Sequence, residues 1–158
     1  MQKILRIALV LMTCLVVGYL SGMVTRESIT TWYPTLIKPV FNPPNWIFAP
    51  VWTILYIMMG LAGGLVWNKM DTNEKAVKTA FKYFIFQLAL NAAWSFIFFY
   101  LHNLFLALIE LILLWLIIFE VYNQFKKIDK RAGMLFIPYL LWVSFAGVLN
   151  FSIWWLNR

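Results

Sequence analysis

The chain has 158 residues, of which 63% are hydrophobic and only 12% are charged, and its mean hydropathy is +0.80. A soluble domain holds roughly half apolar residues and a quarter charged ones, and one of this size could not hide so much apolar surface. The composition therefore indicates an integral membrane protein. The net charge of +7 does not indicate nucleic-acid binding, because the cations flank apolar segments, where anionic lipid headgroups attract them.

Five segments with few or no charged residues are long enough to cross about 30 Å of hydrocarbon, which takes about 20 helical residues. They cover roughly residues 4–24, 46–67, 82–101, 104–124 and 133–156. Such long unbroken segments favour helices over the short alternating strands of a membrane barrel. The sequence predicts an all-α membrane protein, a bundle of five transmembrane helices that forms a single domain over residues 1–158.

The first segment has two interpretations. Lys3 and Arg6 precede an apolar core, as in a secretory signal peptide. The apolar run from residue 7 to residue 24 is longer than the usual core of such a peptide, and it contains small residues such as Gly18. These features favour a retained transmembrane helix.

The basic residues are unevenly divided between the two ends of the predicted bundle. Arg26, Lys38 and Arg158 belong to one end. Because cytoplasmic loops carry the excess of Lys and Arg, we expect a cytoplasmic N-terminus and an external C-terminus. The lack of an organellar presequence favours a bacterial cell membrane. The ten basic residues of the other end are Lys3, Arg6, Lys69, Lys75, Lys78, Lys82, Lys126, Lys127, Lys130 and Arg131.

Three of the predicted helices carry aromatic and amide side chains on one face, at spacings of three and four residues. A carboxamide in hydrocarbon is costly unless it is hydrogen-bonded, so we expect these faces to point into the bundle. The three faces comprise Trp52 and Tyr56 in the second segment, Gln87, Asn91 and Trp94 in the third, and Trp142, Ala146 and Leu149 in the fifth.

Few residues suggest conventional catalysis or metal binding. The single Cys14 excludes an intrachain disulfide and a cysteine-based zinc site, and the single His102 has no ligand partner nearby in the sequence. Glu110 and Glu120 fall within the fourth segment, where a carboxylate indicates either a functional site or a helix-to-helix hydrogen bond. We predict no metal site and no general acid–base constellation.

Pairs of small residues four apart permit close approach of helices in a membrane. We favour Ala89 and Ala93 as the contact of a homodimer. The three pairs are Gly18 with Gly22, Gly60 with Gly64, and Ala89 with Ala93.

Four short sequence motifs follow one another along the chain. The pattern WYxxLxKP begins at Trp32, and NPPxWxFxPVWTxLY runs from Asn42 to Tyr56. The pattern QLALNxxW covers residues 87–94, and PYLxW covers residues 138–142. In order and spacing, over the whole chain, these motifs resemble the translocator protein family, the tryptophan-rich sensory proteins.

The resemblance implies a homodimeric five-helix membrane protein, here a bacterial member, that binds porphyrins such as protoporphyrin IX and benzodiazepine-type drugs. Its pocket is expected between the helices beneath the first loop, with no required cofactor. Trp52 and Trp142 match two tryptophans linked to light- and oxygen-dependent breakdown of protoporphyrin. The implied ligand-binding residues are Tyr33, Pro43, Trp52, Tyr56, Gln87, Asn91, Trp94, Glu110, Leu111, Trp142, Ala146 and Leu149.

Three functions fit the resemblance: a porphyrin-binding sensory protein, a photo-oxidative enzyme that acts on the same ligand, and a porphyrin or lipid transporter. A transporter is the least favoured, because the sequence has no internal repeat. Sterol binding is not expected, since Phe151 replaces the tyrosine of the C-terminal sterol motif and Arg158 lies too far along.

The segment from Lys38 to Ala49 is rich in proline, which restricts φ and removes N–H donors. We expect a rigid, partly extended cover that forms the outer wall and lid of the pocket and turns into helix at Pro50. The anionic propionates of a porphyrin would find Arg26 or Lys38 at the mouth.

Overall fold

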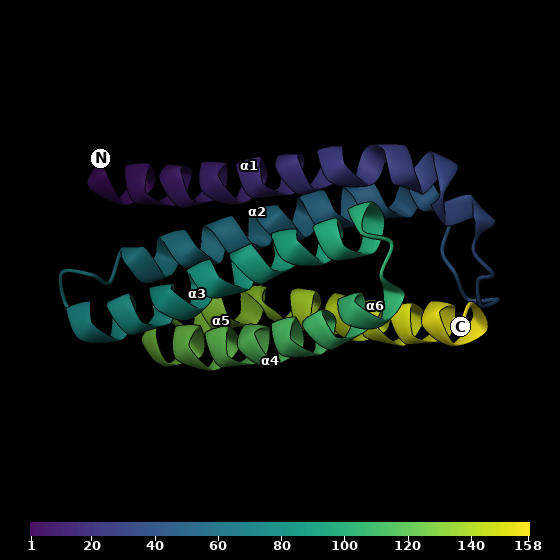
Figure 1. Cartoon of the computed structure of the whole chain (residues 1–158). Helices are drawn as coiled ribbons and strands as arrows, with labels where there is room; N and C mark the ends of the chain where they lie inside the picture. Colours follow the sequence, from purple (N-terminus) through teal and green to yellow (C-terminus); the bar gives the residue numbers. More distant parts are fainter.

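A computed structural model describes residues 1–158 and shows a bundle of five long helices without strands (Figure 1). Each of the five is long and apolar enough to cross a membrane, which confirms the predicted all-α membrane bundle. Two short 3₁₀ turns, Tyr33–Thr35 and Asn45–Ile47, lie in the first loop, and a π-helical segment, Phe96–Tyr100, continues α3. The helices are α1 Gln2–Thr31, α2 Phe48–Trp67, α3 Glu74–Ser95, α4 Leu104–Ile128, α5 Lys130–Leu135 and α6 Ile137–Leu156.

Two helices extend beyond the segments predicted from the absence of charge. Helix α1 continues to Thr31 rather than residue 24, and α3 begins at Glu74 rather than residue 82. The Thr31 hydroxyl donates a hydrogen bond to the Glu27 carbonyl one turn earlier. Glu74 forms an ion pair with Lys78, one turn on in α3. Polar and charged turns thus continue both helices outside their apolar parts.

Prolines shape the starts of two helices. The 3₁₀ turn leads into α2 at Phe48, two residues before the predicted start at Pro50, which occupies the first turn. There its missing N–H has no intrahelical partner to lose. The fifth membrane-spanning helix is interrupted at Phe136, because Pro138 in the first turn of α6 cannot donate to the carbonyl of Met134.

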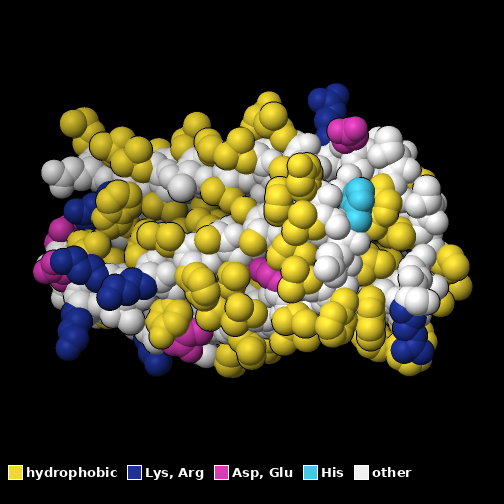
Figure 2. All heavy atoms as spheres, viewed as in Figure 1, with side chains coloured by type: hydrophobic (Ala, Val, Ile, Leu, Met, Phe, Trp, Pro, Cys, Tyr) yellow, Lys and Arg dark blue, Asp and Glu magenta, His cyan; other side chains and the backbone are white.

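The two ends of the bundle differ in charge. The N-terminus, the α2–α3 loop and the α4–α5 junction lie at one end, which we call the basic end (Figure 1). Residues 32–47, the α3–α4 turn and the C-terminus lie at the other, which we call the loop end. Lys and Arg side chains gather at the basic end (Figure 2). This division agrees with the predicted ten-to-three distribution.

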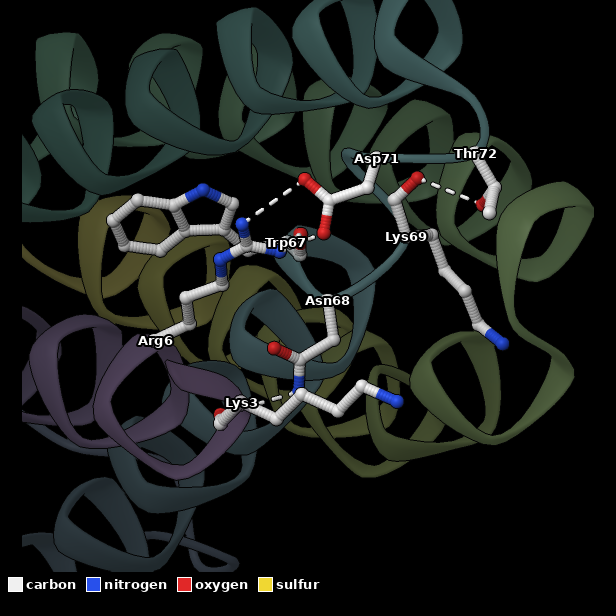
Figure 3. Close-up of polar contacts among 7 residues, drawn as sticks. All are labelled: Lys3, Arg6, Trp67, Asn68, Lys69, Asp71 and Thr72. Carbon is white, nitrogen blue, oxygen red and sulfur yellow. Dashed lines mark hydrogen bonds and ion pairs between the residues drawn. The ribbon is translucent and has the colours of Figure 1, made fainter. Parts of the chain in front are cut away.

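At the basic end, Arg6 ties the start of α1 to the α2–α3 loop (Figure 3). Its guanidinium donates two hydrogen bonds of 3.1 Å to the Asp71 carboxylate and one of 3.3 Å to the Trp67 carbonyl. The Asn68 amide donates to the Lys3 carbonyl at 3.2 Å. The hydrogen bonds and charge of Arg6 hold the pKa of Asp71 below its ordinary value. Helix α1 is therefore fixed to α2 at this end.

Next to the basic end, α1 and α2 are in backbone contact. A Cβ atom added to Gly60 would lie 2.5 Å from the Leu11 Cα, and one added to Gly64 would lie 2.6 Å from the Ile7 Cα. Only glycine permits so close an approach. The Gly60–Gly64 pair thus serves packing within the chain.

Buried apolar side chains form two clusters. The larger holds 20 residues, including Cys14, Met59 and Phe125, and extends through the basic half of the bundle. The smaller lies at the loop end. Apolar side chains also cover the outer surface (Figure 2), as expected where helices face lipid. The smaller cluster consists of Tyr33, Phe98, Phe99, Ala107, Leu149 and Ile153.

Candidate functional site

A cavity of about 630 Å³ lies between α1, α2, α3 and α6 at the loop end. Its volume is typical of sites for small molecules, and 17 of its 28 lining residues are hydrophobic. Helices α4 and α5 contribute no lining residue. The cavity therefore suits a largely apolar molecule held by a few polar groups.

Eight of the twelve predicted ligand-binding residues line this one cavity. Three separate helices and the first loop bring them together, so the faces inferred for the second, third and fifth segments meet around one space. The eight residues are Tyr33, Trp52, Tyr56, Asn91, Trp94, Trp142, Ala146 and Leu149.

The other four predicted residues lie outside the cavity. Glu110 and Leu111 belong to α4, which packs against α3 and α6 and does not reach the cavity wall. Gln87 is fully buried one turn from Asn91 toward the basic end. Pro43 stays in the loop, where its carbonyl accepts a hydrogen bond of 3.1 Å from the Asn42 side chain. Their inclusion among the cavity residues is not supported by the geometry.

The two carboxylates of α4 have different surroundings. Glu120 accepts a hydrogen bond of 2.6 Å from Gln124 in the next turn of α4, a bond within one helix rather than between two. Glu110 is only 8% exposed, and neither of its carboxylate oxygens has a hydrogen-bond partner. Neither side chain lines the cavity.

A buried hydrogen-bond network joins three helices at the cavity's inner boundary. The Tyr56 hydroxyl donates to Asn91 Oδ1, and Asn91 Nδ2 donates to the Tyr139 hydroxyl at 2.7 Å. Tyr139 in turn donates to Gln87 Oε1 at 3.1 Å. Gln87 and Asn91 therefore have partners within the bundle, as their position in hydrocarbon requires.

Aromatic rings surround the cavity from α2, α3 and α6. The Trp52 ring lies 6.0 Å from the Tyr56 ring and 6.2 Å from the Tyr139 ring, centroid to centroid. The Trp142 ring lies 5.5 Å from the Phe145 ring. These contacts fix the two tryptophans as rigid walls of the cavity.

Trp94 holds a third wall in place. Its ring stacks on Phe98 at 5.1 Å, and its indole N–H donates to Asn150 Oδ1 at 3.3 Å. Asn150 also donates to the Leu104 carbonyl at 3.0 Å, so the indole is anchored to both α6 and the start of α4.

Two polar atoms of the cavity-lining residues have no partner. The Ser21 hydroxyl and the Trp142 indole N–H are buried and make no hydrogen bond within the chain. Both atoms are covered by neighbouring protein atoms, so they are not presented to a molecule in the cavity, and they remain exceptions to the usual pairing of buried polar groups.

The two cations expected at the cavity mouth, Arg26 and Lys38, differ in position and in contacts. Arg26 lines the cavity and forms no ion pair. The Lys38 ammonium does not line it. That group donates to the Leu36 carbonyl at 3.0 Å and stands 5.1 Å from the centroid of the Tyr33 ring. Only Arg26 is free to meet an anionic group.

The wall formed by α1 was not predicted, because that helix has no aromatic or amide stripe in its outer half. Its lining residues include Gly18, Ser21, Gly22 and Thr25, spaced at i, i+3, i+4 and i+7. This run of small and hydroxyl side chains on one helix face was the available signal. Phe98 and Phe145 also line the cavity and were not predicted.

Ala89 and Ala93, predicted to form a dimer contact, are not cavity residues. Ala89 is exposed and Ala93 is half-buried on α3. The dimer contact stays a prediction.

Comparison with known proteins agrees with the motifs. The model of the TspO/MBR family matches residues 10–156. The chain is 42% identical to the tryptophan-rich protein TspO of Chlorobaculum tepidum, over 99% of this chain and 98% of that protein. It is 36% identical to the tryptophan-rich sensory protein of Cereibacter sphaeroides, over 80% and 77%. It is 34% identical to the translocator protein of Bos taurus, over 89% and 83%. The chain therefore belongs to the TspO/MBR family.

Proposed function

We propose that this membrane protein binds a flat, hydrophobic tetrapyrrole of the protoporphyrin IX type in the loop-end cavity and acts as a sensory or translocator protein. Benzodiazepine-type drugs would occupy the same space. The observation that carries the proposal is that Trp52, Trp94 and Trp142, from three different helices, line one largely apolar cavity. Aromatic faces at these positions suit stacking against a planar conjugated ring.

The few polar groups of the cavity support an amphiphilic ligand. Arg26 at the mouth can pair with a carboxylate, such as a porphyrin propionate. An apolar body with an anionic edge therefore matches the distribution of groups.

A titration of protoporphyrin IX into the detergent-purified protein tests the proposal. Binding is read from the porphyrin's own absorbance, so that the readout does not depend on the tryptophans that are changed. Replacing Trp52 and Trp142 together by phenylalanine should weaken binding about tenfold, because each indole contributes about 0.5–1.5 kcal/mol of stacking beyond its apolar area.

A double replacement of Trp154 and Trp155 by phenylalanine is the matched control, because neither residue lines the cavity. Its affinity should equal that of the unchanged protein. Equal affinities for both double variants would contradict the assignment of the site.

A second candidate function is photo-oxidative breakdown of the bound porphyrin. It is favoured by the position of Trp52, whose ring lies near Tyr56 and Tyr139, two tyrosines joined through Asn91 by hydrogen bonds. Oxidisable rings in series next to an excited porphyrin could exchange electrons with it or with the oxygen species that it generates.

Illumination of the complex in air separates this activity from binding alone. Enzymatic breakdown predicts that porphyrin absorbance falls faster with the protein than in empty micelles, and that Trp52→Phe slows the loss. A rate equal to that of free porphyrin in micelles would refute turnover and leave the binding function intact.

We also propose that the protein lies in a bacterial cell membrane with the basic end in the cytoplasm. The gathering of Lys and Arg at that end supports this orientation. In intact cells, a membrane-impermeant maleimide should label Arg158→Cys and should not label Lys69→Cys. Cys14 is buried and serves as the unlabelled background. The reverse labelling would overturn the orientation.

Homodimer formation through Ala89 and Ala93 of α3 remains part of the proposal. Small side chains on a lipid-facing helix surface support it, because they let two helices approach closely. Ala89→Cys should form a crosslinked dimer in membranes under mild oxidation, whereas Ile112→Cys on the exposed side of α4 should not.

A further inference from the structure

The exposed part of the cavity wall comes only from α1 and from the neighbouring 3₁₀ turn and first turns of α2. Every lining residue of α3, the π-helical segment and α6 is buried or half-buried. The exposed lining residues are Tyr19, Gly22, Arg26 and Thr30 of α1, Asn45 and Trp46 of the 3₁₀ turn before α2, and Ala49 and Thr53 of α2.

These residues lie in two stripes. On α1 they follow at i, i+3, i+7 and i+11, which places them on one side of the helix. In the 3₁₀ turn and the first turns of α2, Trp46, Ala49 and Thr53 follow at i, i+3 and i+7. The cavity therefore opens lengthwise between α1 and α2, through the side of the bundle.

The opening ends where the two helices come together. Gly18 is in contact with the Tyr56 ring, and Gly60 and Gly64 meet the α1 backbone further toward the basic end. At Gly22, by contrast, an added Cβ atom would meet no atom within 4 Å. The separation of α1 from α2 is thus confined to the loop half.

The first loop is tied down above the cavity. The Tyr33 hydroxyl donates to Asn42 Oδ1 at 2.6 Å. Asn157 at the end of α6 makes two hydrogen bonds with the backbone of Ile37, of 2.9 and 2.8 Å. Entry from the aqueous side would require these bonds to break. On the side, the Asn45 amide donates to the Ile29 carbonyl at 3.4 Å, which closes the opening on the loop side of Arg26 and leaves the part next to Gly22 and Tyr19 open.

From this geometry we propose that the ligand enters the cavity laterally from the lipid, through the opening between α1 and α2, with Arg26 holding its carboxylate at the membrane surface. The inference rests on the proposed function. The class of ligand is an amphiphilic carboxylate dissolved in the bilayer, with an apolar body and an anionic end.

The charges along α1 fit this route. Arg26 is the first charged residue after Arg6, so it marks the far boundary of the apolar segment. Tyr19 lies about 10 Å further into that segment, at 1.5 Å per residue. An amphiphile whose carboxylate pairs with Arg26 would therefore have its apolar body level with Tyr19 and Gly22, where the wall is open.

Blocking the opening tests the proposal. Gly22→Cys places a thiol at the opening without a clash, and a bulky maleimide can then close it, while the buried Cys14 stays unmodified. Met23→Cys is the matched control, because Met23 is 58% exposed on α1 and does not line the cavity. The rates of protoporphyrin IX binding and release are measured in liposomes loaded with the porphyrin.

Labelling at Gly22→Cys should slow binding and release together, by about tenfold or more. Labelling at Met23→Cys should change neither rate. Unchanged rates at Gly22→Cys would overturn lateral entry. Weaker affinity with unchanged or faster release would also overturn it, since the label would then only occupy the site. Failure of the unlabelled protein to bind porphyrin would instead refute the proposed function itself.

The role of Arg26 has its own test. Arg26→Gln should slow the binding of protoporphyrin IX several-fold and leave the binding of its dimethyl ester unchanged, because the ester has no carboxylate. Lys38→Gln should affect neither ligand's binding rate by this much, since Lys38 does not line the cavity. Equal slowing of acid and ester by Arg26→Gln would show that Arg26 does not bind the carboxylate of the entering ligand.

Discussion

The two halves of the α1–α2 pair differ in how closely they pack. In the basic half, Gly60 and Gly64 bring the backbones into contact, and the bidentate Arg6–Asp71 pair joins the helix ends. In the loop half the same two helices separate, and a cavity of about 630 Å³ lies behind them. One half of the interface thus provides a fixed base, and the other half is free to form a site.

Glycine has opposite roles in the two halves. At Gly60 the missing side chain permits backbone contact, and at Gly22 it leaves an opening. Both glycines belong to a small-residue pair with four-residue spacing. The motif alone therefore does not indicate whether a helix face is in contact with another helix.

The largest loss of stability is expected from adding a side chain where α1 and α2 are in backbone contact, in the basic half. Gly60→Leu would place side-chain atoms against the backbone of Leu11, which cannot move without separating the helices. We expect a loss of about 3 kcal/mol in the free energy of unfolding. Gly22→Leu, in open space, should change it by less than about 0.5 kcal/mol. Thermal unfolding in detergent compares the two, and equal losses would contradict the difference between the halves.

A smaller loss is expected from Asn91, which lies at the boundary between the halves. Asn91→Leu would leave the Tyr56 and Tyr139 hydroxyls without one partner each, at a cost of about 1–2 kcal/mol. Thr53→Val is the control, since the Thr53 hydroxyl donates only to a carbonyl of its own helix. A stability for Asn91→Leu equal to that of the control would show that the network adds nothing.

A smaller loss of stability is expected in the first loop, which covers the cavity. Lys38→Met removes two hydrogen bonds to loop carbonyls and the contact with the Tyr33 ring. We expect a local loss of about 0.5 kcal/mol, seen as roughly twofold faster amide hydrogen exchange in residues 36–44. Exchange in α2 next to Gly60 should not change. Faster exchange there would mean that the two halves are not independent.

The smallest effect concerns the Arg6–Asp71 pair. Because the pKa of Asp71 is lowered in the folded protein, its contribution to stability is present above its ordinary pKa of 3.8 and is lost as the pH falls through the folded value. Asp71→Asn should lower the melting temperature near neutral pH by about 2 °C or less, as expected for an exposed pair. The difference from the unchanged protein should vanish in acid. A difference that persists at low pH would contradict the assignment to this ion pair.

The five helices and the positions of Trp52 and Trp142 were predictable from the sequence, because long apolar segments and polar residues at helical spacing constrain both. The part played by α1 was not, because its cavity face consists of small residues that are equally common at helix contacts. Glu110 was expected to bind the ligand, but it does not line the cavity of this structure. A carboxylate within a span indicates a buried position, but spacing does not show whether α4 or its neighbours α3 and α6 reach the cavity.

A structure determined with protoporphyrin IX bound tests the central claim most directly. We predict that the porphyrin lies between Trp52 and Trp142 at the loop end, with one carboxylate near Arg26 and the α1–α2 contact at Gly60 unchanged. A porphyrin bound on the lipid-facing surface or at the basic end, with the loop-end cavity empty, would contradict the account.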